Sequence, residues 1–285
     1  MKSVGLIGLS LAHSLSPQIH AVAFARHGLD AAYELWDTAP DALEARVRSL
    51  RADGCLGANV TVPYKEAVVP FVDSLGETAR KTEAINTIVN RGGRLEGHNT
   101  DVEGFRRALE ETGFEPRGRR AVLLGAGGAA RAVGVALAEA GAGEIVLTDV
   151  IPGRAQALAS RLSALVAATA VEPAGDALSK AVRSCDLLIN CTPLGMRHSP
   201  VERDVPVDVS LIPPGSLVFD LVYNPAATPL MEAAAARGAR AAGGLAMLVY
   251  QAAASFKLWT GLEAPEREML DEGRRALAVS EKGHL

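Results

Sequence analysis

Short apolar runs alternate along the chain with segments in which apolar residues recur at helical spacing. Because this alternation is typical of βαβ units that build parallel sheets, the pattern predicts an α/β fold. The expected strands are Val4–Gly8, Ala32–Trp36, Cys55–Val60, Ile85–Asn90, Ala121–Leu124, Ile145–Asp149, Leu187–Cys191 and Leu217–Leu221. The expected helices are Pro17–His27, Asp41–Leu50, Asp101–Thr112, Ala129–Ala140, Leu245–Trp259 and Pro265–Ala278. The Ser16 hydroxyl, just before Pro17, is expected to cap the first helix.

A polar connector divides the chain into two expected domains. Residues 115 to 120, Glu-Pro-Arg-Gly-Arg-Arg, have the composition of a linker, and a second series of strands and helices follows them. A length of 285 residues is enough for two ordinary domains. The last two predicted helices are expected to return to the first domain.

Composition narrows the class of protein. Hydrophobic residues make up 48% of the chain and charged residues 22%, which is typical of a soluble globular protein. The net charge of −4 disfavours nucleic acid as a partner, because phosphates attract a basic surface. The longest apolar stretch, from Leu245 to Phe256, is too short to span a membrane, which requires about 20 residues.

Cysteine and histidine placement argues against disulfide and metal chemistry. Cys55, Cys185 and Cys191 form no C-x-x-C pair, so neither a disulfide framework nor a thiolate zinc site is indicated. The six histidines form no ligand cluster. These features predict a cytoplasmic protein without a metal site.

A glycine-rich turn between a predicted strand and a predicted helix indicates nucleotide binding. The turn Gly125-Ala126-Gly127-Gly128-Ala129 has the spacing of the dinucleotide fingerprint, whose glycines let a pyrophosphate approach N–H groups at a helix start. Asp149 lies 21 residues after Gly128, where a carboxylate accepts hydrogen bonds from ribose hydroxyls. That carboxylate would repel a 2′-phosphate by up to about 4 kcal/mol. The pattern therefore favours NAD, while Arg154 leaves NADP open.

Polar side chains gather where four predicted strands end. The segments are Ala12-His-Ser14-Leu-Ser16-Pro17, Gly57-Ala-Asn59-Val-Thr61-Val-Pro63-Tyr-Lys65, Ala84-Ile-Asn86-Thr87 and Gly97-His-Asn99-Thr100-Asp101. Because ligands bind at the carboxyl ends of parallel strands, we expect these side chains to converge on one cleft. Such a set of donors and acceptors suits a polyhydroxylated ligand.

Taken together, these segments resemble the shikimate dehydrogenase family, including its quinate/shikimate branch. The motifs that carry the resemblance occur in the family's order between Val4 and Gly261: S-L-S-P, N-V-T-V-P-Y-K, A-I-N-T, G-H-N-T-D, G-A-G-G-A-A-R, N-C-T-P-L-G-M, D-L-V-Y-N-P and M-L-V-Y-Q-A. The resemblance implies an N-terminal α/β substrate-binding domain, residues 1–101 and 241–285, and a Rossmann-type NAD(P)-binding domain, residues 102–240. It also implies NADP-linked interconversion of 3-dehydroshikimate and shikimate in aromatic amino acid biosynthesis.

The resemblance further implies roles for individual residues. Lys65 and Asp101 would form the catalytic pair, because a ketone that receives a hydride also needs a proton at its oxygen, and an ammonium can supply it. The substrate would be bound by Ser14 and Ser16, at its carboxylate, and by Thr61, Asn86, Tyr223 and Gln251. The cofactor would be bound by the glycine turn, Asp149, Arg154, Thr192, Met196, Gly243 and Met247.

One departure from the family bears on the cofactor. NADP-using members usually carry Asn-Arg-Thr where this chain has Asp149-Val150-Ile151, so the arginine that would clamp a 2′-phosphate is missing. In this respect the chain resembles the NAD-linked quinate/shikimate branch. NAD is therefore the expected cofactor, with NADP, the family default, left open.

Several alternatives stay open at this point. Quinate is a second candidate substrate, and a cofactor-sensing module without turnover is a non-enzymatic alternative. A short-chain dehydrogenase is excluded, because no tyrosine is followed four places later by lysine. The sequence leaves open whether the protein is a monomer or a homodimer.

Overall fold

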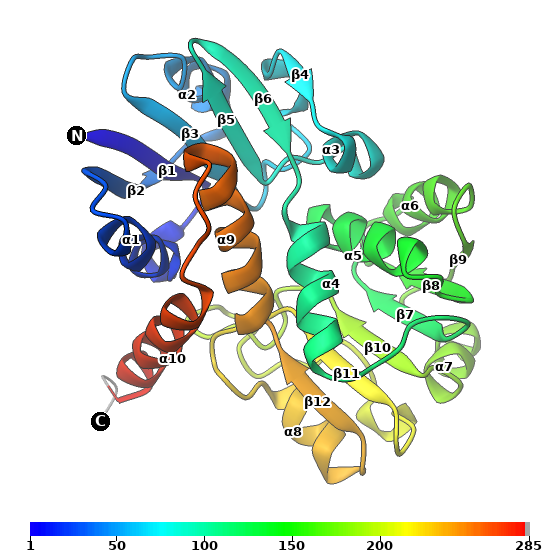
Figure 1. Ribbon diagram of the computed structural model, residues 1–285. Coiled ribbons are helices and arrows are strands. Elements are labelled where there is room, and N and C mark those ends of the chain that lie inside the picture. Colours follow the sequence, from blue (N-terminus) through cyan, green and yellow to red (C-terminus); the bar gives the residue numbers. More distant parts are fainter. Residues whose placement is uncertain (283–285) are drawn as a thin grey trace. The chain divides into compact units, whose positions relative to one another are not determined.

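Two six-stranded sheets organise the chain, one in each of two units (Figure 1). The structure is a computed structural model that describes residues 1–282. The first unit contains residues 1–104 and the chain from residue 248 onward, and the second contains residues 105–247. The domain limits expected from the sequence lie a few residues earlier, because the divisions fall inside two helices, Asp101–Glu111 (α4) and Leu245–Thr260 (α9).

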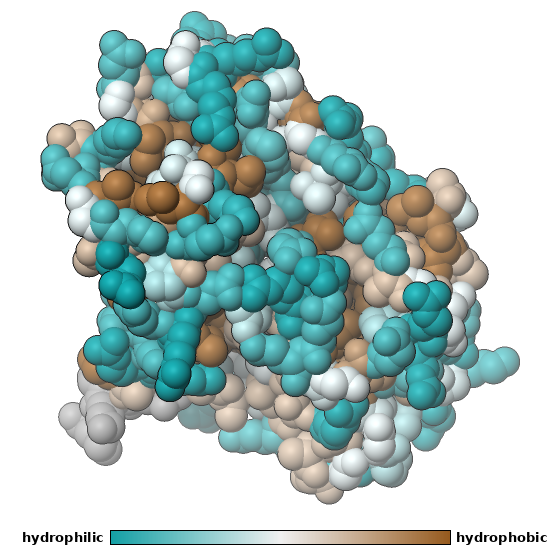
Figure 2. Space-filling view, in the orientation of Figure 1, coloured by the Kyte–Doolittle hydropathy of each residue, from teal (hydrophilic) through white to brown (hydrophobic). Residues whose placement is uncertain are grey.

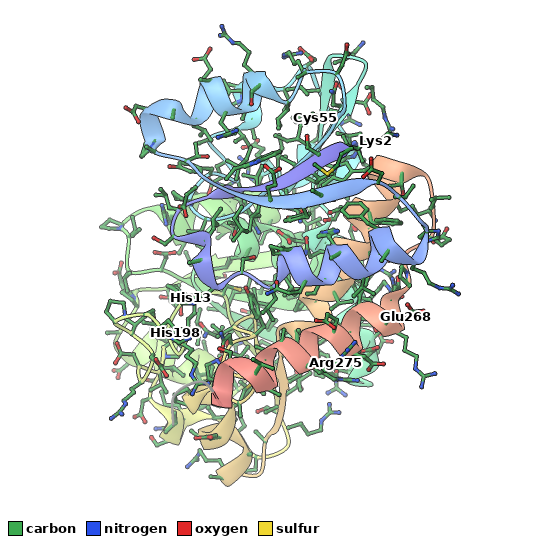
Figure 3. The ribbon with its side chains drawn as sticks, turned by 90° about the vertical axis from the view of Figure 1, so that its left-hand side faces the viewer. Lys2, His13, Cys55, His198, Glu268 and Arg275 are labelled. Atoms are coloured by element: carbon green, nitrogen blue, oxygen red, sulfur yellow. The ribbon has the colours of Figure 1, made fainter. Side chains whose placement is uncertain are left out.

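The first unit contains short strands, helices and the C-terminal return. Its strands are β1 (Lys2–Gly8), β2 (Ala31–Asp37), β3 (Cys55–Val60), β4 (Ser74–Leu75), β5 (Thr87–Arg91) and β6 (Arg94–His98). Its helices are α1 (Ser16–Arg26), α2 (Leu43–Ser49) and α3 (Glu77–Thr82), with α9 and α10 (Glu266–Lys282) returning from the C-terminal part. Helix α10, which carries Glu268 and Arg275, lies alongside α1 (Figure 3). Arg26 of α1 pairs with Glu268 at 3.3 Å.

The sheet of the first unit is mixed rather than parallel. Its strand order is β2-β1-β3-β5-β6-β4. Strands β1, β2 and β3 run parallel, but β5 is antiparallel to both β3 and β6. A two-glycine turn makes this reversal, since Gly92 and Gly93 have φ of 62° and 88°, as tight hairpins require. The expectation of a parallel first sheet is therefore wrong, because this hairpin was not recognised.

The sheet of the second unit is entirely parallel. Its strands are β7 (Arg120–Leu124), β8 (Glu144–Thr148), β9 (Ala167–Ala170), β10 (Leu187–Asn190), β11 (Leu217–Asp220) and β12 (Arg240–Gly243). Its helices are α5 (Gly128–Glu139), α6 (Arg154–Leu162), α7 (Asp176–Arg183) and α8 (Pro229–Ala236). The order β12-β11-β10-β7-β8-β9 is the 3-2-1-4-5-6 order of the Rossmann fold, counted from the unit's own first strand. The predicted α/β class is confirmed.

Burial explains why these strands form. Every residue of β10 and β11 is buried, as expected for central strands of a parallel sheet covered on both faces. The core beside them contains Val122, Leu188, Val218 and Leu230. In the first unit, Ile7, Ala58, Ile88 and Leu95 from successive strands pack with α2. Polar residues cover the side of α4 that faces the viewer in Figure 2. Arg106 and Glu110 of this helix form an ion pair.

The start of α1 differs from the expectation. Ser16 is the first helical residue, and Leu15 occupies the cap position without a side-chain cap. The Ser14 hydroxyl instead accepts a hydrogen bond from the Ser16 backbone N–H at 3.3 Å. The prediction that Ser16 caps this helix is wrong by one position, because Pro17 is tolerated at the second helical residue as well as the first.

Candidate active site

Lys65, Asn86 and Asp101 meet at one edge of the first unit's sheet. Lys65 follows the end of β3, and Asp101 follows the end of β6. Asn86 precedes β5 rather than ending a strand, contrary to the sequence interpretation. Because β5 runs antiparallel to its neighbours, its start lies at the same edge as their ends. The convergence therefore occurs, although the reason differs from the expected one.

The centre of this group is an ion pair between Lys65 and Asp101. Lys65 Nζ lies 2.6 Å from Asp101 Oδ2, and the two side chains are 13% and 6% exposed. Asp101 is the first residue of α4, where a negative charge is stabilised by the helix N-terminus. Its backbone N–H donates to Asn99 Oδ1 at 3.1 Å. A shielded ion pair of this geometry holds both charges in fixed positions.

Asn86 fixes the other oxygen of the same carboxylate. Its Nδ2 donates to Asp101 Oδ1 at 2.9 Å and lies 3.2 Å from Oε1 of Gln251 on α9. The Gln251 Nε2 donates to the Leu248 carbonyl at 2.7 Å, within the same helix. The structure thus brings together four of the residues predicted from the sequence: Lys65, Asn86, Asp101 and Gln251.

A second row of buried polar side chains lies behind this group, and the sequence analysis gave it no role. Its members are Asn59, Thr87, Thr100 and Ser255, all at most 5% exposed. Asn59 Nδ2 donates to Ser255 Oγ at 3.0 Å, and the Thr87 and Ser255 hydroxyls are 2.7 Å apart. Three of the four, Asn59, Thr87 and Thr100, belong to the motifs quoted above. Their polar side chains next to buried strands are the sequence signal that could have indicated this row.

Ser14, Ser16 and Thr61 lie in segments that follow β1 and β3. Because these strands are parallel, both segments are at the same edge of the sheet as Lys65. Ser14 and Thr61 are partly exposed, whereas Ser16 is 7% exposed. Thr61 is held by its backbone N–H, which donates to the Ile7 carbonyl at 2.9 Å.

The second unit carries the glycine turn at its topological switch point. The turn follows β7, and Thr192 follows the neighbouring strand β10, where the strand order reverses. Gly125 has φ of 100°, and a Cβ there would lie 3.1 Å from the Thr192 methyl group and 3.2 Å from the Cys191 carbonyl carbon. Only glycine allows this close approach. Dinucleotides bind at such points in open α/β sheets.

The turn fits a pyrophosphate. Gly127, Gly128 and Ala129 are partly exposed at the start of the twelve-residue helix α5. A Cβ added to Gly127 would meet nothing within 4 Å, so space is open above the first N–H groups of the helix. These N–H groups have no partner within their own helix and favour an anion.

Asp149 is engaged with the turn itself. Its Oδ2 accepts a hydrogen bond from the Ala126 N–H at 2.7 Å, and its Oδ1 accepts from the Ile151 N–H at 2.8 Å. The spacing of 21 residues after Gly128 suits an acid that stabilises the turn as well as one that binds ribose. Arg154 begins α6 nearby in the chain, and it is exposed.

A buried carboxylate supports the loop that carries Thr192. The Thr192 hydroxyl donates to Asn190 Oδ1 at 2.6 Å, and Asn190 Nδ2 donates to Asp220 Oδ1 at 2.9 Å. Burial raises the pKa of Asp220, while hydrogen bonds from Thr228, Val222 and Asn190 oppose the rise. Burial also raises the pKa of the Cys191 thiol, so this thiol stays protonated.

The remaining predicted residues occupy separate places in the second unit. Tyr223 and Gly243 are partly exposed, Met247 is 7% exposed, and Met196 is 40% exposed. Within residues 1–282, no group of three or more His, Cys, Asp or Glu side chains is placed to hold a metal ion. No helix in the described part of the chain is both long and apolar enough to cross a membrane.

A parallel Rossmann sheet with an open glycine turn, together with a separate unit that holds a shielded lysine–aspartate pair, defines the class of dinucleotide-dependent oxidoreductases. Family models agree with this assignment. Residues 6–88 match the shikimate dehydrogenase substrate binding domain, and residues 244–272 match the shikimate 5'-dehydrogenase C-terminal domain.

Whole-chain relatives identify the family. Shikimate dehydrogenase (NADP(+)) of Moorella thermoacetica is 48% identical, over 98% of this chain and 95% of the relative. Shikimate 5-dehydrogenase of Thermus thermophilus, solved with NADP(H) and shikimate, is 39% identical with a TM-score of 0.85, covering 97% of this chain and 100% of that one. Quinate dehydrogenase of Corynebacterium glutamicum, solved with NAD, is 33% identical with a TM-score of 0.87, covering 96% and 99%. The chain belongs to the shikimate dehydrogenase family.

These relatives correct the expectation of NAD. The curated relatives that are 40% to 48% identical are named for NADP(+), so the preference drawn from Asp149 is wrong. A carboxylate that faced the ribose freely would repel a 2′-phosphate. Both Asp149 oxygens instead accept backbone N–H groups, which offset part of their charge.

Proposed function

We propose that this protein catalyses the reversible reduction of 3-dehydroshikimate to shikimate with NADPH as the hydride donor. The observation that carries the proposal is the shielded pair of Lys65 Nζ and Asp101 Oδ2, 2.6 Å apart at the sheet edge. The names of the relatives support the substrate and the cofactor. Quinate is not favoured, because the quinate dehydrogenase is less similar in sequence, at 33% identity, than the NADP(+) relatives.

The paired side chains supply the proton chemistry. When bound, NADPH supplies a hydride to the carbonyl carbon of the substrate. The Lys65 ammonium stabilises the negative charge that develops on the carbonyl oxygen and donates the proton that completes the hydroxyl. In the reverse direction, Lys65 acts as a neutral base that accepts the proton of the substrate hydroxyl. Asp101 orients Lys65 and accepts a hydrogen bond from the same hydroxyl.

The rest of the first unit binds and orients the substrate. We assign the substrate carboxylate to the Ser14 and Ser16 hydroxyls. We assign Thr61, Asn86 and Gln251 to the ring hydroxyls of the substrate, and we assign Tyr223 to the substrate as well. The hydrogen bonds that fix Asn86 support this role, because a preorganised amide loses little entropy on binding.

The second unit binds the dinucleotide. The turn Gly125-Ala126-Gly127-Gly128-Ala129 holds the pyrophosphate, with Asp149 stabilising the turn. Arg154 is the candidate cation for the 2′-phosphate, because it is exposed at the start of α6 and follows the strand that ends beside Asp149. Thr192, Met196, Gly243 and Met247 surround the remainder of the cofactor. The three cysteines are free thiols, which suits a cytoplasmic enzyme.

The test is a kinetic comparison of Lys65→Ala with the wild type. With shikimate and NADP, we expect kcat to fall at least about a hundredfold, with far less change in KM. Lys2→Ala, at an exposed position, serves as the control. A near-normal kcat for Lys65→Ala would remove this residue from the mechanism. Parallel assays with quinate should give a lower kcat/KM than shikimate, and the opposite order would reassign the substrate.

A further inference from the structure

Ser255 places a fully buried hydroxyl on the apolar helix α9, one turn after Gln251. Its Oγ lies 2.7 Å from Thr87 Oγ1, 3.0 Å from Asn59 Nδ2 and 3.1 Å from Thr100 Oγ1. It also donates to the Gln251 carbonyl at 2.9 Å. A single hydroxyl thus joins side chains from three separate segments of the first unit, and it contacts neither Lys65 nor Asp101 directly.

The direction of the hydrogen bonds at Asn86 is fixed by the backbone. The Thr100 backbone N–H donates to Asn86 Oδ1 at 2.7 Å. Because a backbone N–H is only a donor, the atom opposite it must be the amide oxygen. The amide nitrogen of Asn86 therefore faces Asp101 Oδ1 and Thr100 Oγ1, each at 2.9 Å.

The orientation of Asn59 is fixed in the same way. Its Nδ2 donates to the Asn86 backbone carbonyl at 3.1 Å, and its Oδ1 accepts from the Tyr33 hydroxyl at 2.8 Å. One N–H of Asn59 is therefore committed to a carbonyl. The second N–H points to the oxygens of Ser255 and Thr87.

These constraints order the hydroxyl groups. Because Ser255 donates its only proton to the Gln251 carbonyl, its oxygen acts as an acceptor for the donors that face it, Asn59 Nδ2, Thr87 Oγ1 and Thr100 Oγ1. When Thr100 donates to Ser255, its own oxygen accepts the N–H of Asn86. Without Ser255, the Thr100 hydroxyl would be free to donate to Asn86 Oδ1, 3.2 Å away, or to Thr87 Oγ1, 3.3 Å away, so it would no longer hold the Asn86 amide in one orientation.

We propose that Ser255 is a positioning residue for Asp101, acting through Thr100 and Asn86 to hold the Asn86 N–H on the Asp101 carboxylate. This inference rests on the proposed function, because it assigns Ser255 to the reaction that Lys65 and Asp101 perform. The carboxylate keeps its alignment with Lys65 only while its second oxygen is held by Asn86. Buried networks of this kind are rigid when every donor has an acceptor.

The test is a double-mutant cycle with Ser255→Ala and Thr100→Val, which both remove a hydroxyl at little cost in volume. Each single variant should lower kcat for shikimate oxidation about tenfold, since each leaves a buried donor or acceptor unmatched. KM for NADP should stay within about twofold of the wild type. Both variants remove the same hydrogen bond between Thr100 and Ser255. The double variant should therefore lose no more kcat than the worse single variant.

Val249→Ala is the matched control for stability. Val249 is fully buried on the same helix, and its truncation should lower Tm with kcat unchanged. If Ser255→Ala keeps kcat within twofold of the wild type, or if the two losses multiply in the double variant, the inference is overturned. It is likewise overturned if Val249→Ala loses as much kcat at a similar fall in Tm. Should Ser255→Ala fail to fold, Thr100→Val measures the same link from its other side. A wild-type protein without turnover of shikimate would instead contradict the proposed function.

Discussion

The Thr228 hydroxyl lies 2.6 Å from Oδ2 of Asp220 and donates to a carboxylate that is fully buried at the end of β11. The other oxygen, Oδ1, accepts from Asn190 Nδ2 at 2.9 Å and from the Val222 N–H at 3.0 Å. Burial raises the pKa of Asp220, and these donors limit the rise. The ionised form of this carboxylate therefore depends on these three hydrogen bonds.

Thr228→Val tests this dependence. Loss of the hydroxyl should destabilise the protein by about 2 kcal/mol at neutral pH, because the hydrogen bond is made to a buried charge. The folded-state pKa of Asp220 is raised above its unfolded value, and the substitution raises it further. Stability in the variant should therefore fall as pH rises above the ordinary value of 3.8, and the deficit should shrink toward acidic pH. Calorimetry across this pH range measures it, with exposed Thr169→Val as the control. A deficit independent of pH would contradict the account.

Gly127→Ala separates folding from cofactor binding. Gly127 has a negative φ, and a Cβ there would meet no protein atom within 4 Å, so Tm should change little. The methyl group would occupy the space through which a pyrophosphate approaches the start of α5. We expect KM for NADP to rise at least about tenfold with KM for shikimate nearly unchanged. An unaltered KM for NADP would show that the dinucleotide does not lie against this turn.

Arg154→Ala examines the cation assigned to the 2′-phosphate. Removal of a guanidinium that pairs with this phosphate should lower kcat/KM with NADP about tenfold to a hundredfold, and it should leave kcat/KM with NAD nearly unchanged. Arg203→Ala, at another exposed position of the second unit, is the matched control. Equal losses with both cofactors would mean that Arg154 does not recognise the 2′-phosphate.

His20 predicts a pH dependence of stability in the first unit. Its ring is fully buried and stacks on Tyr33 at 4.4 Å, and burial lowers its pKa to about 3. Between that value and the ordinary 6.5, the unfolded chain binds a proton that the folded chain does not, so stability is lost as pH falls. From pH 7 to pH 5 this group should cost about 2 kcal/mol of unfolding free energy.

The corresponding experiment is denaturant unfolding of His20→Phe at both pH values. The substitution keeps a stacked ring and removes the titrating group, so the acid-dependent loss should become smaller. His27→Gln, at an exposed position of the turn after α1, is the control. An unchanged loss in His20→Phe would assign the pH dependence to other groups.

The sequence predicted the α/β class, most of the strands and the pairing of Lys65 with Asp101, because local patterns carry that information. Strand direction was harder to predict, since the antiparallel pairing of β5 depends on a contact with β3 across the sheet. Gly92 and Gly93 are a hairpin signal that was not recognised in the sequence, and strand β6 after them was not predicted. The predicted residues therefore converge, but the predicted direction of strand β5 is wrong.

Two site features were beyond what sequence patterns can provide. Asp149 has the spacing of a ribose-binding acid, but the same spacing suits an acid that accepts the Ala126 N–H of its own turn. Ser255 is one hydroxyl in an apolar helix, and only the tertiary contacts with Asn59, Thr87 and Thr100 distinguish it from a solvated serine. The roles assigned to Lys65, Asp101 and all the other substrate and cofactor residues stay predictions.

The split of the first unit between the two ends of the chain sets an order for biosynthesis. Gln251 lies 165 residues beyond Asn86, and Ser255 lies 168 residues beyond Thr87. At typical translation rates this separation corresponds to a delay on the order of ten seconds. The nascent chain thus exposes the nucleotide-binding sheet in full before the polar groups around Lys65 acquire their last partners, so catalytic competence arrives only after helix α9 has left the ribosome.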